Sequence, residues 1–207
     1  MIFVCFKKKK FSTNTATARQ PLLKECLHLL TLARLCSKVR HTAAGGIPLG
    51  AEIKEEIFKC VFVDTGLALN TLGLRPITEK NYEDALWANK GALAEQMVGV
   101  LFKAGATPYC QKLFYWQQMG SSNAEIDYLV QDNETVVPVE VKAGKSGSMK
   151  SMHQFMYAKN LKRAIRFDMN APSQRNVSVK TQKGKPVEYT LYNYPLYMAE
   201  LAVPGLK

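Results

Sequence analysis

Two short β-like segments, residues 125–130 and 135–141, constrain the fold of this chain more than any other feature of its sequence. They are separated by Gln-Asp-Asn-Glu, whose residue types favour a tight turn. If the turn centres between Asn133 and Glu134, the segments form an antiparallel hairpin in which the numbers of opposite residues sum to 267. Because side chains alternate between the two faces of a strand, this register assigns each hairpin residue to a face.

The register predicts one apolar face and one face on which charges gather. The apolar face is expected to hold Ile126, Tyr128, Val130, Val137, Val139 and Val141. On the other face, the expected pairs are Glu125 with Lys142, Asp127 with Glu140, and Leu129 with Pro138. Opposite residues have Cβ atoms about 4.5 to 5.5 Å apart, so two carboxylates placed in this way repel each other.

A divalent cation between Asp127 and Glu140 would remove this repulsion. Mg²⁺ and Mn²⁺ prefer oxygen ligands in an octahedral arrangement, so the two carboxylates form a candidate chelate. Lys142 points to the same face, where its ammonium could orient or help deprotonate a metal-bound water, or stabilise charge on a phosphate. The alternative is a solvent-facing hairpin in which Glu125 pairs with Lys142. Pro138, which lacks an N–H group, argues against a fully central strand.

A helix over Tyr82–Ala104, interrupted at Gly91, is expected to bring a third carboxylate to this place. One predicted apolar face consists of Leu93, Met97, Val100, Leu101 and Ala104. The helical neighbours of Glu95 are small or apolar, and they are Gly91, Ala92, Val98, Gly99 and Phe102. Small residues let a helix approach a sheet closely, so Glu95 is expected near the strand carboxylates. The alternative is a glutamate that reaches water at the helix edge.

The remaining chain divides into three predicted parts. Residues 1–20, with four consecutive lysines and no period, are expected to form a disordered arm or to lie outside the fold. Residues 21–65 are expected to form a small module, in which a helix from Pro21 carries Leu22, Cys26, Leu29, Leu30 and Ala33 on one face and leads to a strand over Phe58–Val63. Residues 66–207 are expected to form an α/β domain, with a helix over 148–163 and strands over 113–117, 164–167 and 187–192.

Composition narrows the classes of protein that this chain can represent. A hydrophobic content of 47% over 207 residues is enough for a full core. Apolar runs are too short to span a bilayer, and the opening Met1–Phe6 places its charges after the apolar stretch, the reverse of a signal peptide, so a cytoplasmic location is expected. The five cysteines form no CxxC pair, which argues against a zinc site.

The net charge of +11 is distributed unevenly along the chain. Residues 1–46 carry a net charge of +8, residues 47–141 of −6, and residues 142–207 of +9. An acidic middle between basic ends suits a carboxylate metal site bordered by a surface that binds phosphates. A solvated basic surface without a nucleic-acid partner explains the same charges.

Taken together, these residues resemble a known signature. A helical Glu95, then Glu125-Ile126-Asp127, then Glu140-Val141-Lys142, resembles the E…D…ExK pattern of the PD-(D/E)xK nuclease superfamily. More closely, GALAEQMV, LFYWQ, AEIDYLV and VPVEVKAG, preceded by VFVDTGLAL, resemble the domain of unknown function that follows the ATPase module in a family of prokaryotic AAA-type ATPases. The resemblance covers about residues 22–167, with the segments in the family's order.

The resemblance implies an α/β, restriction-endonuclease-like fold: a mixed sheet of four or five strands flanked by helices and preceded by the end of a winged-helix-like segment. It implies that Asp127 and Glu140 bind Mg²⁺ or Mn²⁺, that Glu95 completes the metal site, and that Lys142 assists the attacking water. Gln154, on the following helix, matches a position where related nucleases place a polar residue. Ile126 stands where the signature has proline, and the ATPase module of the family does not occur in this sequence.

Two functions from different classes follow as hypotheses. The first is a metal-dependent phosphodiesterase that acts on DNA. The second is a non-catalytic DNA-binding or regulatory module that serves a P-loop ATPase as its partner. The chain itself is not expected to bind ATP, because Gly144-Lys145-Ser146 resembles the end of a P-loop but Val139 occupies the position of its first glycine.

Overall fold

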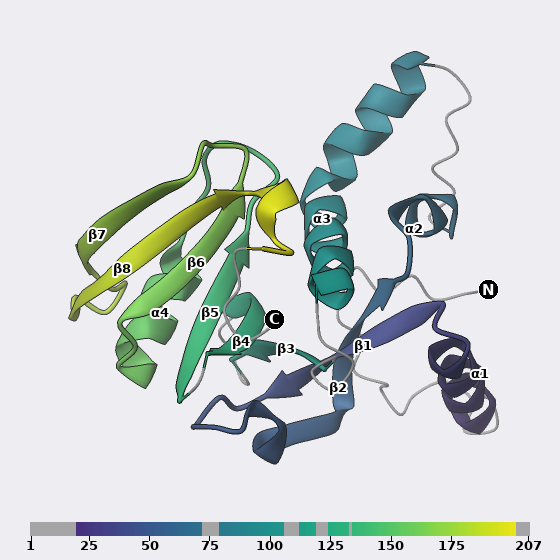
Figure 1. The fold of residues 1–207 in the computed structure, drawn as a ribbon, viewed down its shortest axis with the longest axis horizontal. Helices are drawn as coiled ribbons and strands as arrows, with labels where there is room; N and C mark the ends of the chain where they lie inside the picture. The colour runs from purple at the N-terminus through teal and green to yellow at the C-terminus, as the bar shows by residue number, and fades with distance from the viewer. Residues whose placement is uncertain (1–19, 72–78, 106–111, 119–123, 133, 202–207) are drawn as a thin grey trace.

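The computed structural model describes residues 20–71, 79–105, 112–118, 124–132 and 134–201. Except for Gln20, the arm expected over residues 1–20 lies outside these residues, and so does Asn133 in the expected turn. In the described part of the chain, the fold is mixed α/β, with one sheet of eight strands and a few helices (Figure 1). No helix in these ranges has the length and apolar character needed to cross a membrane.

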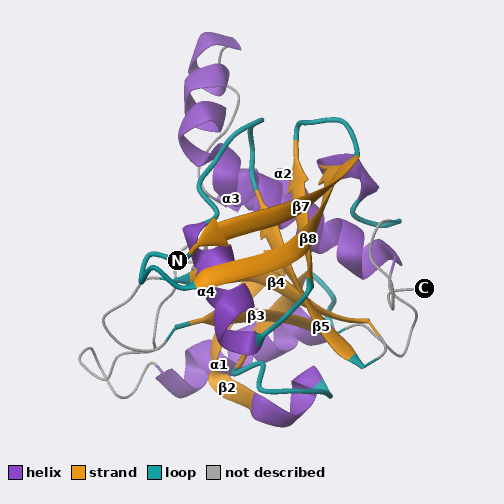
Figure 2. Ribbon diagram, turned by 90° about the vertical axis from the view of Figure 1, so that its left-hand side faces the viewer, coloured by secondary structure: helices purple, strands orange, loops and turns teal. Residues whose placement is uncertain are grey.

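The sheet has the strand order β2-β1-β3-β4-β5-β6-β8-β7. Its strands are β1 (Cys36–Thr42), β2 (Ile53–Phe62), β3 (Leu113–Gln117), β4 (Glu125–Asp132), β5 (Thr135–Val141), β6 (Arg163–Asp168), β7 (Ser173–Lys180) and β8 (Pro186–Pro195). The pairs β1/β3, β5/β6 and β6/β8 are parallel, and the other neighbours are antiparallel. The direction of β7 and β8 crosses that of β4 and β5, so the sheet is twisted (Figure 2).

Helices cover both faces of the sheet. They are α1 (Gln20–Leu32), α2 (Thr65–Thr71), α3 (Glu79–Gly105) and α4 (Lys150–Lys159), with single 3-10 turns at Leu49–Glu52 and Leu196–Met198. On one face, α3 buries Ala94, Val98 and Phe102 against the centre of the sheet. On the other face, α4 buries Met152, Phe155 and Met156. The central strands are therefore covered on both sides, as the strands of a parallel sheet usually are.

The predicted register of the β4–β5 hairpin is confirmed over its inner five pairs, from Asp132 opposite Thr135 to Tyr128 opposite Val139. Beyond Tyr128 the two strands separate. There a side-chain hydrogen bond takes the place of the backbone hydrogen bonds between the strands. The Oδ2 atom of Asp127 accepts this bond of 2.8 Å from the backbone N–H of Val141. After this fork, β5 continues beside β6 and β4 continues beside β3.

A bulge in β4 changes the predicted faces. Phe114 pairs with Leu129 and Trp116 with Ile126, so β4 has one residue more than β3 over this interval. As a result Ile126 packs on the α4 side with Leu129, whereas Tyr128 faces α3. The prediction that Ile126 shares the face of Tyr128 was therefore wrong.

The alternative of a solvent-facing hairpin is also wrong. Leu129 and Pro138 belong to the face that was expected to hold the charges, and both are buried. Pro138 lies on a central strand, contrary to expectation. Its missing N–H costs no interstrand bond to β6, because the parallel pairing of β5 with β6 begins at the next residue, Val139.

The segment before residue 65 contributes a helix and two strands to the fold. The predicted helix from Pro21 is present as α1, but Leu22 and Leu29 on its predicted apolar face are 61% and 56% exposed. Within residues 36–62, Cys36–Thr42 forms β1 and Ile53–Phe62 forms β2, and β1 joins the large sheet through parallel pairing with β3. The domain boundary at residue 65 stays a prediction, but these two strands belong to the same sheet as the rest.

Candidate active site

Helix α3 carries Glu95 against the sheet at a point where the two elements almost touch. It runs without interruption through Gly91, contrary to the prediction, and Met97 on its predicted apolar face is 37% exposed. A Cβ atom on Gly99 would lie 2.5 Å from Tyr128 Oη and 2.8 Å from a Val61 methyl carbon, so only glycine allows this approach. The Tyr128 hydroxyl donates a hydrogen bond of 2.8 Å to the backbone carbonyl of Glu95. The prediction that small residues bring Glu95 close to the sheet is confirmed.

A buried amide fixes the rotation of α3 next to Glu95. Gln96 is 3% exposed, and its side chain accepts a hydrogen bond of 3.0 Å from Phe62 N and donates one of 2.7 Å to Phe62 O. This two-point contact with the end of β2 satisfies the buried amide and holds the helix in one orientation. Glu95 is therefore positioned by the residue beside it as well as by Gly99.

The fork between β4 and β5 positions the other predicted residues. Asp127 lies at the fork, Glu140 on β5, and Lys142 directly after β5, where its backbone N–H donates to Phe167 O at 2.8 Å. The ammonium of Lys142 forms an ion pair with Glu140 Oε1. The predicted pairing of Lys142 with Glu125 therefore gives way to a contact with Glu140, because the strands have separated before reaching Glu125.

Lys59, a residue that the sequence analysis did not single out, lies among these carboxylates. It comes from β2, and its Nζ lies 2.5 Å from Glu125 Oε1, 3.4 Å from Glu95 Oε2 and 4.8 Å from the centre of the Tyr115 ring. The sequence does contain a signal, since a lysine interrupts the apolar run around Phe58–Val63. What the sequence lacks is any local reason to bring β2 beside α3.

The electrostatics of the site are dominated by burial and by like charges. Burial and the charges of Glu95 and Glu140 raise the pKa of Asp127 well above its usual value, although Lys59 and the Val141 N–H act against them. Burial also raises the pKa of Glu140, and Lys142 offsets this only in part. These shifts show that the three predicted carboxylates lie close enough to repel one another.

The pKa of Lys59 shifts in favour of its charged form, whereas the pKa values of Asp127 and Glu140 shift in favour of their neutral forms. Burial acts to lower the pKa of its ammonium, but the carboxylates of Glu95, Asp127 and Glu125 outweigh burial and raise the pKa above its usual value. Lys59 is therefore a permanent cation at physiological pH, and it partly neutralises the acidic cluster from within the chain.

With all four of its carboxylates ionised, the cluster is two positive charges short of balance. Its members are Glu95, Glu125, Asp127 and Glu140 on the acidic side, and Lys59 and Lys142 on the basic side. Oε2 of Glu140 is buried without a hydrogen-bond partner among the described residues. A divalent cation fits both this charge deficit and the hard oxygen donors of Asp127 and Glu140.

Geometry limits how many protein ligands such a cation would find. Within the described ranges, no group of three or more His, Cys, Asp or Glu side chains is arranged to hold a metal ion. Glu95 is directed to Lys59, so a metal set of Asp127, Glu140 and Glu95 stays a prediction. Two carboxylates are a common protein contribution to a Mg²⁺ site, in which water and substrate phosphate supply the other ligands.

Gln154 makes a side-chain hydrogen bond to a residue outside the acidic cluster. Its amide on α4 donates a hydrogen bond of 3.0 Å to the Gln118 side chain, which follows β3. The backbone N–H of Gln118 in turn donates to Ala124 O, directly before β4. This contact ties α4 to the ends of β3 and β4, and the predicted role of Gln154 in the site stays a prediction.

Comparison with known families gives one match. Residues 90–196 match the model of a family described as Domain of unknown function (DUF4143), a little over half of the chain. The matched range contains Glu95, the fork, Lys142 and the strands that follow, but not Lys59. No curated protein and no solved structure matches the chain.

Proposed function

The chain belongs to the DUF4143 family, and from the charges gathered at the β4–β5 fork we propose that it is a metal-dependent phosphodiesterase that acts on DNA. We also propose that its sheet is a PD-(D/E)xK nuclease-like fold and that it works together with an AAA-type ATPase. One observation carries the proposal: Glu95 on α3, Asp127 on β4 and Glu140 on β5 meet, with Lys142 directly after β5, in one cluster that holds more acidic than basic groups.

The cation would be held by Asp127 and Glu140. When bound, a divalent metal ion supplies Lewis acidity toward a phosphate and lowers the pKa of a water molecule. The strained electrostatics of Asp127 support this assignment, because a carboxylate whose ionised form is disfavoured by its neighbours gains most from a cation.

The two lysines of the cluster would orient other groups at the site or stabilise negative charge there. The Lys142 ammonium, already paired with Glu140, could hold a water molecule or stabilise negative charge on the phosphate. Lys59 would hold Glu95 in place through their ion pair. Since the Lys59 and Lys142 side chains are 16% and 25% exposed, their charges are screened by water less than charges on the open surface.

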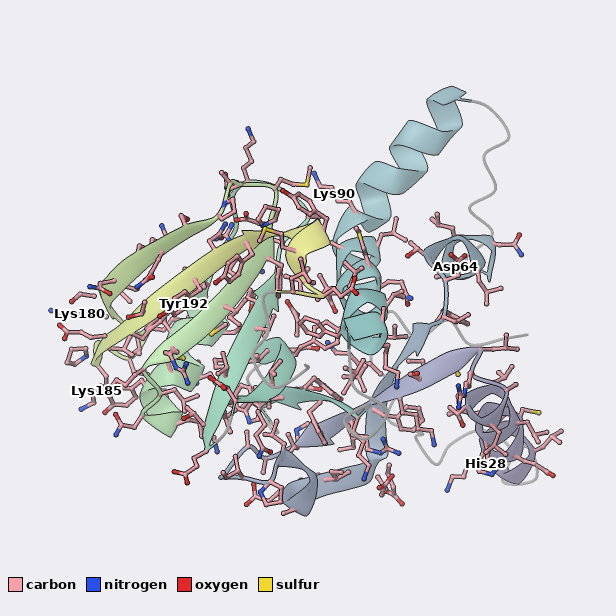
Figure 3. All side chains as sticks on the ribbon, in the orientation of Figure 1. His28, Asp64, Lys90, Lys180, Lys185 and Tyr192 are labelled. Carbon is pink, nitrogen blue, oxygen red and sulfur yellow. The ribbon has the colours of Figure 1, made fainter. Side chains whose placement is uncertain are left out.

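The distribution of positive charge supports DNA as the substrate. Arg175, Lys180, Lys183 and Lys185 are exposed on β7 and on the turn to β8, and Lys180 and Lys185 project from the tip of that hairpin (Figure 3). Exposed cations on a projecting hairpin can follow a phosphate backbone without reading its sequence.

A second function is favoured by one specific contact. Lys59 already forms ion pairs with Glu95 and Glu125, so part of the acidic cluster is neutralised by the protein itself. This arrangement supports a nuclease-like fold that serves as a non-catalytic DNA-binding or regulatory module of an ATPase.

A nicking assay separates the two functions. Plasmid and branched DNA are incubated with Mg²⁺ or Mn²⁺ and with the wild type or the variants Asp127→Ala, Glu140→Ala and Lys142→Ala. We expect each substitution to lower the rate of cleavage by about a hundredfold or more. The matched control is Glu134→Ala, which removes an exposed carboxylate from the turn of the same hairpin and should leave the rate unchanged.

The same assay can reject the enzyme. Cleavage that needs no metal, or that survives all three substitutions, would show that another site or a contaminant cuts the DNA. Binding of DNA by the wild type without any cleavage under these conditions would favour the non-catalytic module.

A further inference from the structure

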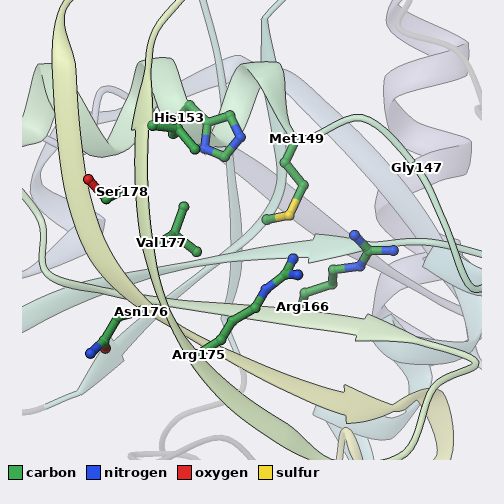
Figure 4. Close-up of a pocket in the computed structure, with 9 residues that line it drawn as sticks. Gly147, Met149, His153, Arg166, Arg175, Asn176, Val177 and Ser178 are labelled. Carbon is green, nitrogen blue, oxygen red and sulfur yellow. The ribbon is translucent and has the colours of Figure 1, made fainter.

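A pocket of about 390 Å³ lies between α4 and the edge strand β7 (Figure 4). Gly147 and Met149 before α4, His153 on α4, Arg166 on β6 and Arg175 on β7 line it, together with the β7 residues after Arg175. Its size is in the usual range for small-ligand sites, which are about 300 to 1,000 Å³. None of these residues belongs to the acidic cluster at the β4–β5 fork, although Arg175 is one of the exposed cations named above.

Arg166 supplies a buried guanidinium to the pocket. The residue is 5% exposed, and its Nη2 donates a hydrogen bond of 3.3 Å to Lys145 O. Its Nε lies 2.8 Å from Asp168 Oδ2, yet the N–H has no aligned acceptor among the described residues. Asp168 also accepts hydrogen bonds from Asn170 and Asn193. The Asp168 carboxylate is therefore shared among several donors, and the Arg166 guanidinium can still donate a hydrogen bond to another acceptor.

Arg175 supplies a second guanidinium that lacks an acidic partner in the described part of the chain. Figure 4 shows its side chain reaching into the pocket toward Met149. Its charge acts on the pocket wall: burial and the Arg175 charge lower the pKa of His153, which is therefore neutral at pH 7. The His153 ring is held by a hydrogen bond of 2.9 Å between Nδ1 and the Tyr189 hydroxyl. The pocket thus presents one buried and one uncompensated cation.

The start of α4 adds to this positive character. Met149 is its N-cap residue and makes no side-chain hydrogen bond to the first turn. Since the first N–H groups of a helix have no partner within the helix, they carry partial positive charge toward whatever lies before them. Although Ser148 Oγ accepts a hydrogen bond of 3.4 Å from Lys150 N, two guanidinium groups and a helix N-terminus around one pocket favour a ligand with several oxygen acceptors and a negative charge.

The pocket also borders the candidate active site. Arg166 is the parallel partner of Glu140 across β5 and β6, and neighbouring strands lie about 5 Å apart. On the loop, a Cβ atom on Gly147 would lie 2.8 Å from Lys142 Cδ, so the backbone that lines the pocket packs against the side chain of Lys142. A ligand that extends from Lys142 across β6 would therefore reach the two arginines.

We infer that this pocket binds a phosphate group of a nucleic-acid strand, beside the phosphate that would be cleaved next to Lys142. The identity of the ligand rests on the proposed function, whereas binding in the pocket does not require cleavage. Arg175 is the side chain to test, because it is exposed on an edge strand and its replacement leaves the core intact.

Binding of a fluorescently labelled oligonucleotide is measured by anisotropy in EDTA, over a series of salt concentrations. We expect Arg175→Gln to weaken binding several-fold and to reduce the slope of log K against log salt by about 0.7 for a single strand or 0.9 for a duplex. Arg175→Lys should retain part of the affinity. The matched control is Arg34→Gln, which removes an exposed arginine from the turn after α1.

Three outcomes would overturn the inference. The first is unchanged affinity in Arg175→Gln, and the second is an equal loss in Arg34→Gln. The third combines two measurements: calorimetry shows that inorganic phosphate binds and that Arg175→Gln abolishes this binding, while the affinity for the oligonucleotide does not depend on Arg175. The pocket would then bind a free phosphate compound rather than a nucleic-acid strand.

Failure of this inference is distinguishable from failure of the proposed function. A protein that binds DNA through Arg175 but never cleaves it contradicts the enzyme alone. A protein that cleaves DNA, loses cleavage in Asp127→Ala, and binds equally well without Arg175 contradicts the pocket alone.

Discussion

Asp127 combines a structural and a chemical role in a single side chain. One of its oxygens ends the β4–β5 ladder by accepting the Val141 N–H, and its charge repels those of Glu95 and Glu140. The hydrogen bond holds the carboxylate at the fork although its ionised form is disfavoured there. A site that is poorly stabilised without its ligand is typical of positions that serve function.

We predict that Asp127→Asn raises the melting temperature of the metal-free protein at pH 7. The amide can still accept the Val141 N–H, but it removes a buried charge. The pKa of Asp127 is raised in the folded state, so stability of the wild type decreases as pH rises from the unfolded pKa, about 3.9, through the folded pKa. The advantage of the variant should therefore disappear as the pH falls toward 4, which thermal melts in EDTA across this range can check.

Adding Mg²⁺ or Mn²⁺ gives the complementary measurement. A cation that binds Asp127 and Glu140 should raise the melting temperature of the wild type and not that of Asp127→Asn. A variant that melts below the wild type at pH 7, or one that responds equally to the metal, would contradict the assignment.

At the scale of elements, the contact between α3 and the sheet decides where Glu95 lies. The helix buries Val98 and Phe102, and Gly99 lies directly against Val61 and Tyr128. Val61 is β-branched and buried, and Tyr128 is held by its hydrogen bond to Glu95, so neither can move aside easily.

We predict that Gly99→Ala destabilises the protein by about 1 to 3 kcal/mol, because the added methyl group overpacks the contact. Gly91→Ala on the same helix is the matched control. Its Cβ would meet no atom within 4 Å, so helix propensity alone should stabilise the protein by about 0.5 to 1 kcal/mol. Denaturant unfolding of both variants measures the difference, and a stabilising Gly99→Ala would show that the helix does not lie this close.

At the scale of the whole molecule, β1 links the N-terminal segment to the remaining sheet. Val39 on β1 is fully buried and belongs to the core cluster formed by α3 with the central strands. A chain that shares one sheet and one core across residue 65 should unfold as one unit rather than as two domains.

We predict that Val39→Ala lowers the free energy of unfolding by roughly 1 to 3 kcal/mol and shifts the whole transition. Far-UV circular dichroism and tryptophan fluorescence, to which the part-buried Trp116 contributes, should shift together. The control is Leu29→Ala, whose side chain is 56% exposed on α1 and should matter little. A separate early transition that moves alone would support a domain boundary at residue 65.

Local patterns made part of this structure predictable. The β4–β5 register followed from a short turn and from period-two alternation, and both depend only on neighbouring residues. The approach of Glu95 followed from the small residues around it on the helix. By contrast, β7 was not predicted, because Ser173–Lys180 is an exposed edge strand with little apolar alternation.

The sequence by itself determined the register of the β4–β5 hairpin and the close approach of α3 to the sheet at small residues such as Gly99. It also determined the order in which the four residues Glu95, Asp127, Glu140 and Lys142 occur. Tertiary structure alone decided that β2 lies beside α3 and so places Lys59 among the carboxylates, that a bulge against β3 turns Ile126 to the α4 side, and that Arg166 and Arg175 share a pocket. The reason is physical: alternation and helix period act over a few residues, whereas these contacts depend on strand pairings between segments distant in the sequence.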